Sequence, residues 1–373
     1  MTDLAPRPGS RRTDLDLLRV VACFAIIVAH ATLIFTSEPR YHVKSASPHL
    51  LPTVIYEAFR IGTIPLFFAL AGWGSVVALR RRSGARFLRD RAERILLPLV
   101  AGILLLGPII RFIELQQGRN IGLGGWRLVD PLTTGLLEFL PRYWGRLNLL
   151  TWSHLWFLAY LFIISVVLLP LLQHLARQVV SMRMPGRMLA FLPAPALAVV
   201  AVAGDAYWPN LSNLVQDWGS LVFYAACVAL GAWLAAWPGL EGRLRQDAPL
   251  FLALAALGFA LMVAAPDSVT GRIGVGLCAW GAIGASFGYA GRHPPAASRA
   301  LSWLGGSTMA VYVLHHVPLL LIAAALLPLA MPGAAAWAII VVATTAITLA
   351  AYRWLVEPFA APRLLVGMPR RKA

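Results

Sequence analysis

The sequence predicts an all-α protein, a polytopic membrane bundle of about ten transmembrane helices with both termini in the cytoplasm. Only 13% of its 373 residues are charged and 59% are hydrophobic, with a mean hydropathy of +0.72. Soluble globular domains carry about 25% charged residues. The apolar residues also form long blocks, such as 17–35 and 334–351, which reach the roughly 18 residues of a membrane-spanning helix. These observations exclude a water-soluble globular fold.

Ten spans follow from the apolar blocks, and together they form one membrane domain over residues 17–355, between an N-terminal tail (1–16) and a C-terminal tail (356–373). The first apolar block is longer than the roughly 7–15 residues of a signal-peptide core, so we expect it to remain as the first span. The predicted spans are 17–37, 53–79, 95–113, 153–173, 188–204, 218–238, 249–265, 273–291, 302–328 and 334–355.

Positive charge orients these spans. The chain carries 32 Lys and Arg against 16 Asp and Glu, a formal charge of +16. Bases gather in both tails and in every even-numbered loop, which the positive-inside rule assigns to the cytoplasm. The largest group follows the second span, between Arg80 and Arg94. Because there is no soluble basic domain, we expect this charge to face anionic lipid and no nucleic acid.

Arg19 and His30 are candidate functional residues in the first span, because ionisable groups inside a membrane are costly and mark function by default. Eleven helical steps return to within about 20° of the same face, with a rise of about 16 Å. We therefore expect Arg19 at the cytoplasmic mouth of a cavity and His30 near its midplane end. A structural role stays open, with Arg19 as a topology anchor and His30 as a packing residue.

His315 and His316 lie at a comparable depth in the ninth span. Adjacent helical residues point about 100° apart, so only one can face the same cavity as His30. Helix packing and catalysis both remain open for them. No carboxylate or cysteine cluster at ligand spacing accompanies them, so no metal is expected. Three cysteines fall inside spans without a paired framework and are expected in the core: Cys23, Cys227 and Cys278.

The segment 87–98 (FLRDRAERILLP) precedes the third span on the cytoplasmic side. Arg89, Arg91 and Arg94 have planar guanidinium groups that bind phosphates through paired hydrogen bonds. The same three bases also fit ordinary positive-inside charge.

Six segments in this order resemble acyltransferase family 3, the multi-pass membrane enzymes that O-acylate bacterial glycans. The resemblance extends over nearly the whole chain, since these segments are distributed along it. One departure is Ala71-Gly72-Trp73, where the family more often has Ser-Gly-Phe. The segments are 15–22 (LDLLRVVA) with Arg19 and His30 at the family's Arg-x10-His spacing, 64–72 (IPLFFALAG), 87–98, 154–158 (HLWFL), 304–315 (LGGSTMAVYVLH) and 356–358 (VEP).

The resemblance implies transfer of an acyl group, usually acetyl or succinyl, from cytoplasmic acyl-CoA to a saccharide hydroxyl at the bacterial inner membrane. The segment 154–158 looks most like the glucan succinylation subgroup. His30 would take the proton of the acceptor hydroxyl, and Arg19 would orient CoA or hold charge near the reacting atoms. The resemblance places the donor phosphates on Arg89, Arg91 and Arg94. Its implied substrate-binding residues are His154, Trp156, Ser307, Tyr312 and His315.

Two other functions remain open. A ten-helix transporter would use buried arginines and histidines for substrate or proton handling, and an inverted repeat with broken helices would favour it. We find no convincing repeat, although Pro65 and Pro318 are placed to break the second and ninth spans. A non-catalytic scaffold on a degenerate family fold is less compatible with the intact Arg19–His30 pair.

Overall fold

The computed structural model describes residues 12–122, 125–178, 182–205, 212–214 and 216–369. Most of the bases that we placed in the two tails lie outside these ranges. Five helices are long and apolar enough to cross a membrane. They are α1 (Thr13–Leu33), α2 (Leu50–Leu79), α11 (Trp218–Ala236), α14 (Val269–Arg292) and α17 (Gly333–Ala351), the last extended by the π-turn Tyr352–Val356.

Four further candidate spans are pairs of helices that are bent at a short break. The first three pairs are α4 (Leu97–Leu105) with α5 (Gly107–Gln116), α7 (Trp156–Val167) with α8 (Leu169–Ala176), and α12 (Pro238–Gln246) with α13 (Ala248–Ala264). The fourth is α15 (Arg299–Leu314) with α16 (His316–Leu326). The short helices α3 (Gly84–Arg91) and 92–96 lead into α4, and Ser153–Leu155 leads into α7.

The described residues thus hold up to nine candidate spans, one fewer than predicted. Each of the ten predicted apolar blocks is helical, which confirms the all-α bundle. The fifth predicted block, 188–204, forms α9 (Arg187–Phe191) and α10 (Pro193–Ala203), which are too short together to count as a full span. The predicted seventh span coincides with α13. The preceding α12 is a charged helix bent 77° away from it.

Proline determines where one important helix breaks. Pro65 lies inside α2 without ending it, contrary to one expectation. Pro318 acts as expected: its ring would meet the carbonyl of Leu314, four residues earlier, and α15 ends at Leu314. The axis bends by 57° there. This bend separates His315 from His316 and lets the two rings face different surroundings.

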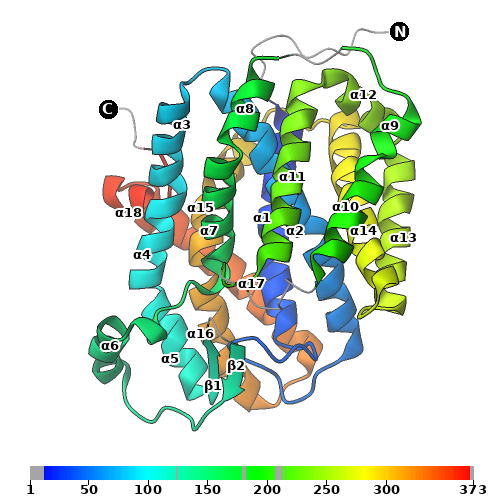
Figure 1. The fold of residues 1–373 in the computed structure, drawn as a ribbon. Coiled ribbons are helices and arrows are strands. Elements are labelled where there is room, and N and C mark those ends of the chain that lie inside the picture. Colours follow the sequence, from blue (N-terminus) through cyan, green and yellow to red (C-terminus); the bar gives the residue numbers. More distant parts are fainter. Residues whose placement is uncertain (1–11, 123–124, 179–181, 206–211, 215, 370–373) are drawn as a thin grey trace.

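The predicted even-numbered loops gather at one end of the bundle. Side-chain hydrogen bonds join them in a chain, from Arg80 to Ala235, from Arg243 to Pro185 and from Arg292 to Arg245. In Figure 1 this end is at the top, with α3, α8 and α12. We call it the arginine-rich end. The gathering agrees with the predicted topology, in which these loops share the cytoplasmic side.

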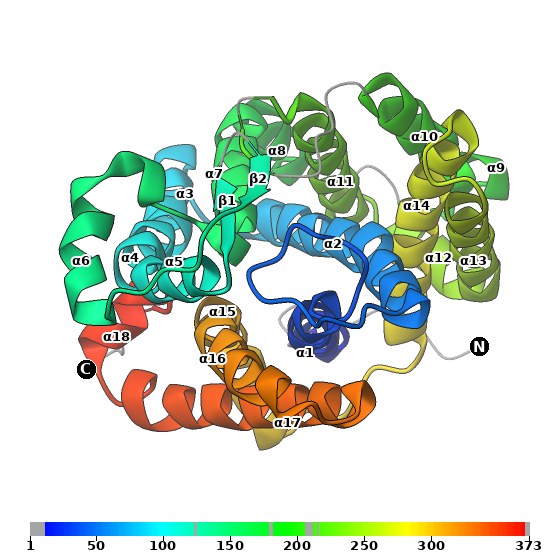
Figure 2. The ribbon, with the colours of Figure 1, turned by 90° about the horizontal axis from the view of Figure 1, so that it is seen from below.

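The opposite end carries the long loop that we expected there. It folds as a small antiparallel hairpin of β1 (Arg119–Gly122) and β2 (Gly125–Leu128), followed by α6 (Leu136–Gly145) and the turn Leu147–Leu149. The C-terminal α18 (Ala360–Leu365) packs against α4. In Figure 2, seen from the hairpin end, α1 is surrounded by five helices: α2, α14, α15, α16 and α17.

Glycine lets the central helices approach closely. A Cβ at Gly231 of α11 would lie 1.9 Å from the carbonyl oxygen of Ala69 on α2. A Cβ at Gly72 of α2 would lie 1.9 Å from the carbonyl oxygen of Val228 on α11. Inside a membrane the hydrophobic effect does not drive helices together. Small residues at such crossings let the helices pack closely enough for van der Waals contact to do so. The crossing holds α2 in place beside α1. There α2 forms one wall of the site.

Candidate active site where two cavities meet

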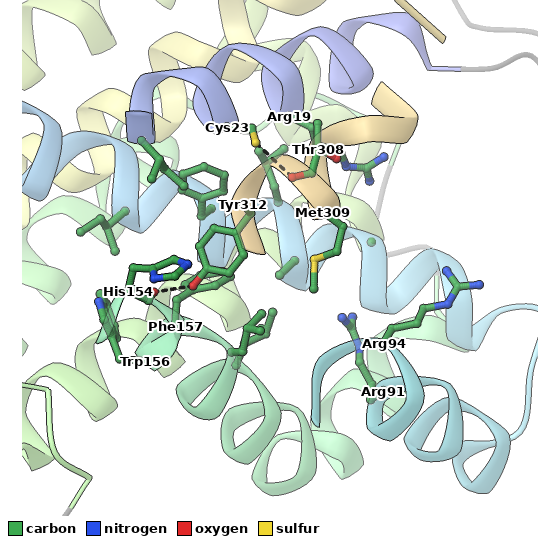
Figure 3. A pocket seen from close by; sticks show the side chains of 18 of the residues that line it. Arg19, Cys23, Arg91, Arg94, His154, Trp156, Phe157, Thr308, Met309 and Tyr312 are labelled. Carbon is green, nitrogen blue, oxygen red and sulfur yellow. Dashed lines mark hydrogen bonds between the residues drawn. The ribbon is translucent and has the colours of Figure 1, made fainter. Parts of the chain in front are cut away.

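A cavity of about 480 Å³ begins among arginines and ends at histidines. Arg19, Arg91 and Arg94 line one part of it, while His30, His154 and Trp156 line another. We call this the inner cavity. Figure 3 shows Arg91 and Arg94 across the cavity from α1, which carries Arg19. The placement confirms that Arg19 and His30 of α1 line one cavity.

The arginine segment places only two of its three candidate residues in the cavity. Arg91 and Arg94 are three helical residues apart and share a face, whereas Arg89 is turned about 200° from Arg91. The Arg89 side chain is 82% exposed, and its Nε lies 3.7 Å from Glu93 Oε1. Arg89 lines neither cavity. Arg91 donates a 2.6 Å hydrogen bond to Ser75 Oγ and stacks on Phe87. Arg89 is therefore outside the expected phosphate site.

A second cavity of about 500 Å³ lies toward the hairpin end. We call it the outer cavity. Its lining holds more carboxylates than that of the inner cavity, with the Glu57–Arg60 ion pair at 2.6 Å, Glu38 with Arg40, and Asp217. Burial raises the pKa of Asp217. Burial acts in the same direction on Glu38, but hydrogen bonds from Arg40 outweigh it and hold its pKa below the ordinary value.

The two cavities share four lining residues: His30, Ile64, His154 and Trp156. A group at this junction can meet one reactant from each end of the bundle. His154 is buried at this shared wall, whereas His30 is half-buried.

The hydrogen bonds of His315 determine which nitrogen of His30 is basic. His315 Nδ1 lies 2.9 Å from the carbonyl oxygens of Val311 and Tyr312, so it carries the hydrogen and donates. The lone pair of His315 Nε2 then accepts from His30 Nδ1, at 2.9 Å. A neutral His30 therefore has its free lone pair on Nε2, the arrangement that a general base needs.

The remaining predicted residues fall into two groups. His154 and Trp156 line both cavities, and Tyr312 lines the inner one while its hydroxyl donates to the His154 carbonyl, at 2.6 Å (Figure 3). Ser307 and His315 are fully buried and line neither cavity. Ser307 donates to the Leu304 carbonyl within its own helix, so the structure gives it no contact with a substrate.

His316, on the other side of the bend, lines the outer cavity. This confirms that only one of the two adjacent histidines faces a cavity that His30 also lines. Ring nitrogens of His30, His315 and His316 lie within 4.8 Å of one another, a spacing that would admit a metal ion. In these tautomers His30 has Nδ1 in a hydrogen bond and His315 has both ring nitrogens in hydrogen bonds, so a metal ion would have to displace them. The absence of a metal stays a prediction.

The predicted site residues do not include several groups of the outer cavity, among them Tyr41, His42 and Ser153. His42 and Tyr41 come from the loop between α1 and α2, where only a pair of aromatic rings beside charged residues offered a signal. Ser153 adjoins His154 in sequence, but a lone serine carries no pattern. The cysteines lie in the core as expected, although Cys23 also lines the inner cavity.

Comparison with known proteins gives the same family. A family model described as an acyltransferase domain matches residues 12–353. "Glucans biosynthesis protein C" of Escherichia coli O6:K15:H31 (strain 536 / UPEC) is 29% identical over 167 residues, and its counterpart in E. coli O1:K1 / APEC is 29% identical over 164. Each match covers 43% of this chain and 39% of the relative, so it spans well under half of either protein. No solved structure matches the chain. Since the family model covers nearly the whole chain, this multi-pass membrane protein belongs to acyltransferase family 3.

Proposed function

We propose that this chain is a bacterial inner-membrane O-acyltransferase. It transfers an acyl group of the acetyl or succinyl class from acyl-CoA at the arginine-rich end to a saccharide hydroxyl that enters from the hairpin end. His30 is the general base. Membership of the family supports acyl transfer, and the two cavities support a reaction between partners from opposite sides.

The inner cavity suits a CoA thioester. Arg19, Arg91 and Arg94 provide guanidinium groups for its phosphates near the basic end. Between these arginines and His30 the wall is largely apolar, with Ile26, Phe67 and other hydrophobic side chains. Such a wall suits the thin pantetheine arm, which would bring the thioester carbonyl toward the junction.

The outer cavity suits a polyhydroxylated acceptor. Its carboxylates and guanidinium groups can hydrogen-bond to hydroxyls, and Trp152 and Trp156 provide aromatic faces. Two of the relatives are named for glucan biosynthesis, which makes a glucan the acceptor to test first.

At the junction, His30 Nε2 takes the proton of the attacking hydroxyl while its Nδ1–H stays bonded to His315. The single observation that carries the proposal is that His30 lines both cavities with a free lone pair. Positioned bases contribute about 10²–10⁴-fold to a rate.

The test is acyl transfer by the full chain in lipid nanodiscs. Acetyl-CoA and succinyl-CoA, labelled in the acyl group, serve as donors, and glucan oligosaccharides serve as acceptors. We expect ester formation by the wild type and a loss of about 10²–10⁴-fold in His30→Ala. The matched control is His174→Ala, because His174 is on α8 and lines neither cavity. Wild-type transfer by His30→Ala at equal membrane insertion would remove His30 from the mechanism.

A further inference from the structure

Three side chains from distant parts of the chain form a hydrogen-bonded row at the outer cavity. Ser153 Oγ lies 2.8 Å from His42 Nε2, and His42 Nδ1 lies 2.5 Å from Glu114 Oε2. A carboxylate only accepts when ionised, so His42 Nδ1 carries the hydrogen and His42 Nε2 accepts the serine proton. This is the order of a serine nucleophile, its base and the acid that orients the base.

Glu114 is held as a carboxylate. It is fully buried on α5, accepts a hydrogen bond from Arg111 Nη1, and accepts another from the Ile121 amide at 2.7 Å. Arg111 is fixed in turn by Asn120 Oδ1 at 2.7 Å and by the Ile121 carbonyl at 2.8 Å. A buried charge persists only when it is paired and hydrogen-bonded, as it is here. The hairpin strand β1 thus fixes the acid of the row.

Ser153 occupies an uncommon backbone position, with φ of +44°. A non-glycine residue at positive φ is strained, and such residues cluster at functional sites. Three residues later α7 begins at Trp156. Ser153 and His42 both line the outer cavity, and His154, the next residue after Ser153, lines both cavities. The serine is therefore beside the junction where the proposed function brings the thioester.

We propose that Ser153, His42 and Glu114 form a nucleophilic triad that carries the acyl group as a serine ester between acyl-CoA and the acceptor. The inference rests on the proposed function and replaces direct transfer by two steps.

In the first step Ser153 Oγ attacks the thioester carbonyl and His42 Nε2 takes its proton. The carbon–sulfur bond breaks, and its electron pair leaves with CoA as the thiolate. In the second step the acceptor hydroxyl attacks the serine ester and His30 Nε2 takes the hydroxyl proton. The bond between the acyl carbon and Ser153 Oγ breaks, and the oxygen regains its proton from His42. His30 then releases its proton to water, so the products are the acyl ester, CoA and a restored enzyme.

His316 is placed to stabilise the negative oxygen of either tetrahedral intermediate. Its ring is 5.3 Å from that of His42 between centroids and lines the same cavity. Both ring nitrogens are buried, with no hydrogen-bond partner among the described residues. A neutral imidazole always has one N–H, so His316 has a donor that no described acceptor takes.

The direct test is intact-protein and peptide mass spectrometry of the full chain in nanodiscs, acid-quenched after mixing with succinyl-CoA or acetyl-CoA without acceptor. We expect one acyl group per chain, located on Ser153, with a matching burst of free CoA. Ser153→Ala removes both. The alanine keeps the same backbone strain that serine already bears, and Ser153→Gly relieves it, so two variants guard against a folding defect. Ser165→Ala is the matched control, because Ser165 bonds within α7 and lines neither cavity.

His30→Ala separates this inference from the proposed function. We expect this variant to accumulate the Ser153 ester without passing it to glucan oligosaccharides. If the wild type forms glycan esters but gives neither adduct nor burst, and Ser153→Ala keeps its turnover, transfer is direct and the triad is structural. If the wild type esterifies no acceptor from either donor, the proposed function itself fails.

Discussion

Replacing His315 with Phe tests whether the base is oriented through His315. The substitution keeps a ring of similar size in a fully buried position but removes the acceptor 2.9 Å from His30 Nδ1. A buried donor left without its partner costs about 1–3 kcal/mol. His30 can recover this cost by moving its hydrogen to Nε2 or by turning its ring, and either change removes the free lone pair from the junction. At about 1.4 kcal/mol per tenfold, kcat should fall about 5- to 150-fold.

The assay is release of CoA thiol with glucan oligosaccharides as acceptor, followed over a range of acyl-CoA concentrations. His315 lines neither cavity, so KM for acyl-CoA should stay near the wild-type value. His315→Gln should restore part of kcat, because its amide oxygen can accept from His30. The double variant with His30→Ala should be no slower than His30→Ala alone. An unchanged kcat in His315→Phe, or a double variant slowed by the product of both effects, would refute this reasoning.

The remaining predictions concern the donor site, the packing and the metal. Arg91→Glu should raise KM for acyl-CoA about tenfold or more, as loss of a charged hydrogen bond requires, whereas Arg89→Glu should not; equal effects in titrations of the two variants would return both to a topological role. Gly231→Ala should lower the thermal unfolding temperature in detergent, because its Cβ would meet the Ala69 carbonyl oxygen at 1.9 Å; an unchanged midpoint would mean that α2 and α11 can separate at no cost. Elemental analysis of the purified chain should find well under one equivalent of zinc, and EDTA should leave turnover unchanged, because His30 keeps its lone pair for the acceptor; a stoichiometric metal would assign His30 to ligation.

Much of the fold could be predicted because the bilayer restricts what a chain can do. Each apolar block of sufficient length must satisfy its backbone hydrogen bonds internally and therefore forms a helix. The spacing of Arg19 and His30 predicted their shared cavity for a similar reason, since α1 is a continuous helix. The breaks were harder to predict. Pro65 and Pro318 look alike in sequence, but only Pro318 stands at a bend.

The outer half of the site could not be predicted, because it depends on pairings across the chain. His42, Glu114 and Ser153 are separated by up to 111 residues. They come from a loop, a helix end and a short turn, in that order. No periodicity connects such residues. The failure at Arg89 has another origin. The three arginines share one segment, and only their phase on the helix, which turns Arg89 away from the cavity, distinguishes them.

The most direct measurement of the central claim is the amount of acylated glycan formed per mole of inserted protein by His30→Ala and by the wild type. The account predicts that the variant makes at most about one hundredth of the wild-type product. Equal product from the two proteins would contradict the assignment of the reacting centre to the junction of the cavities.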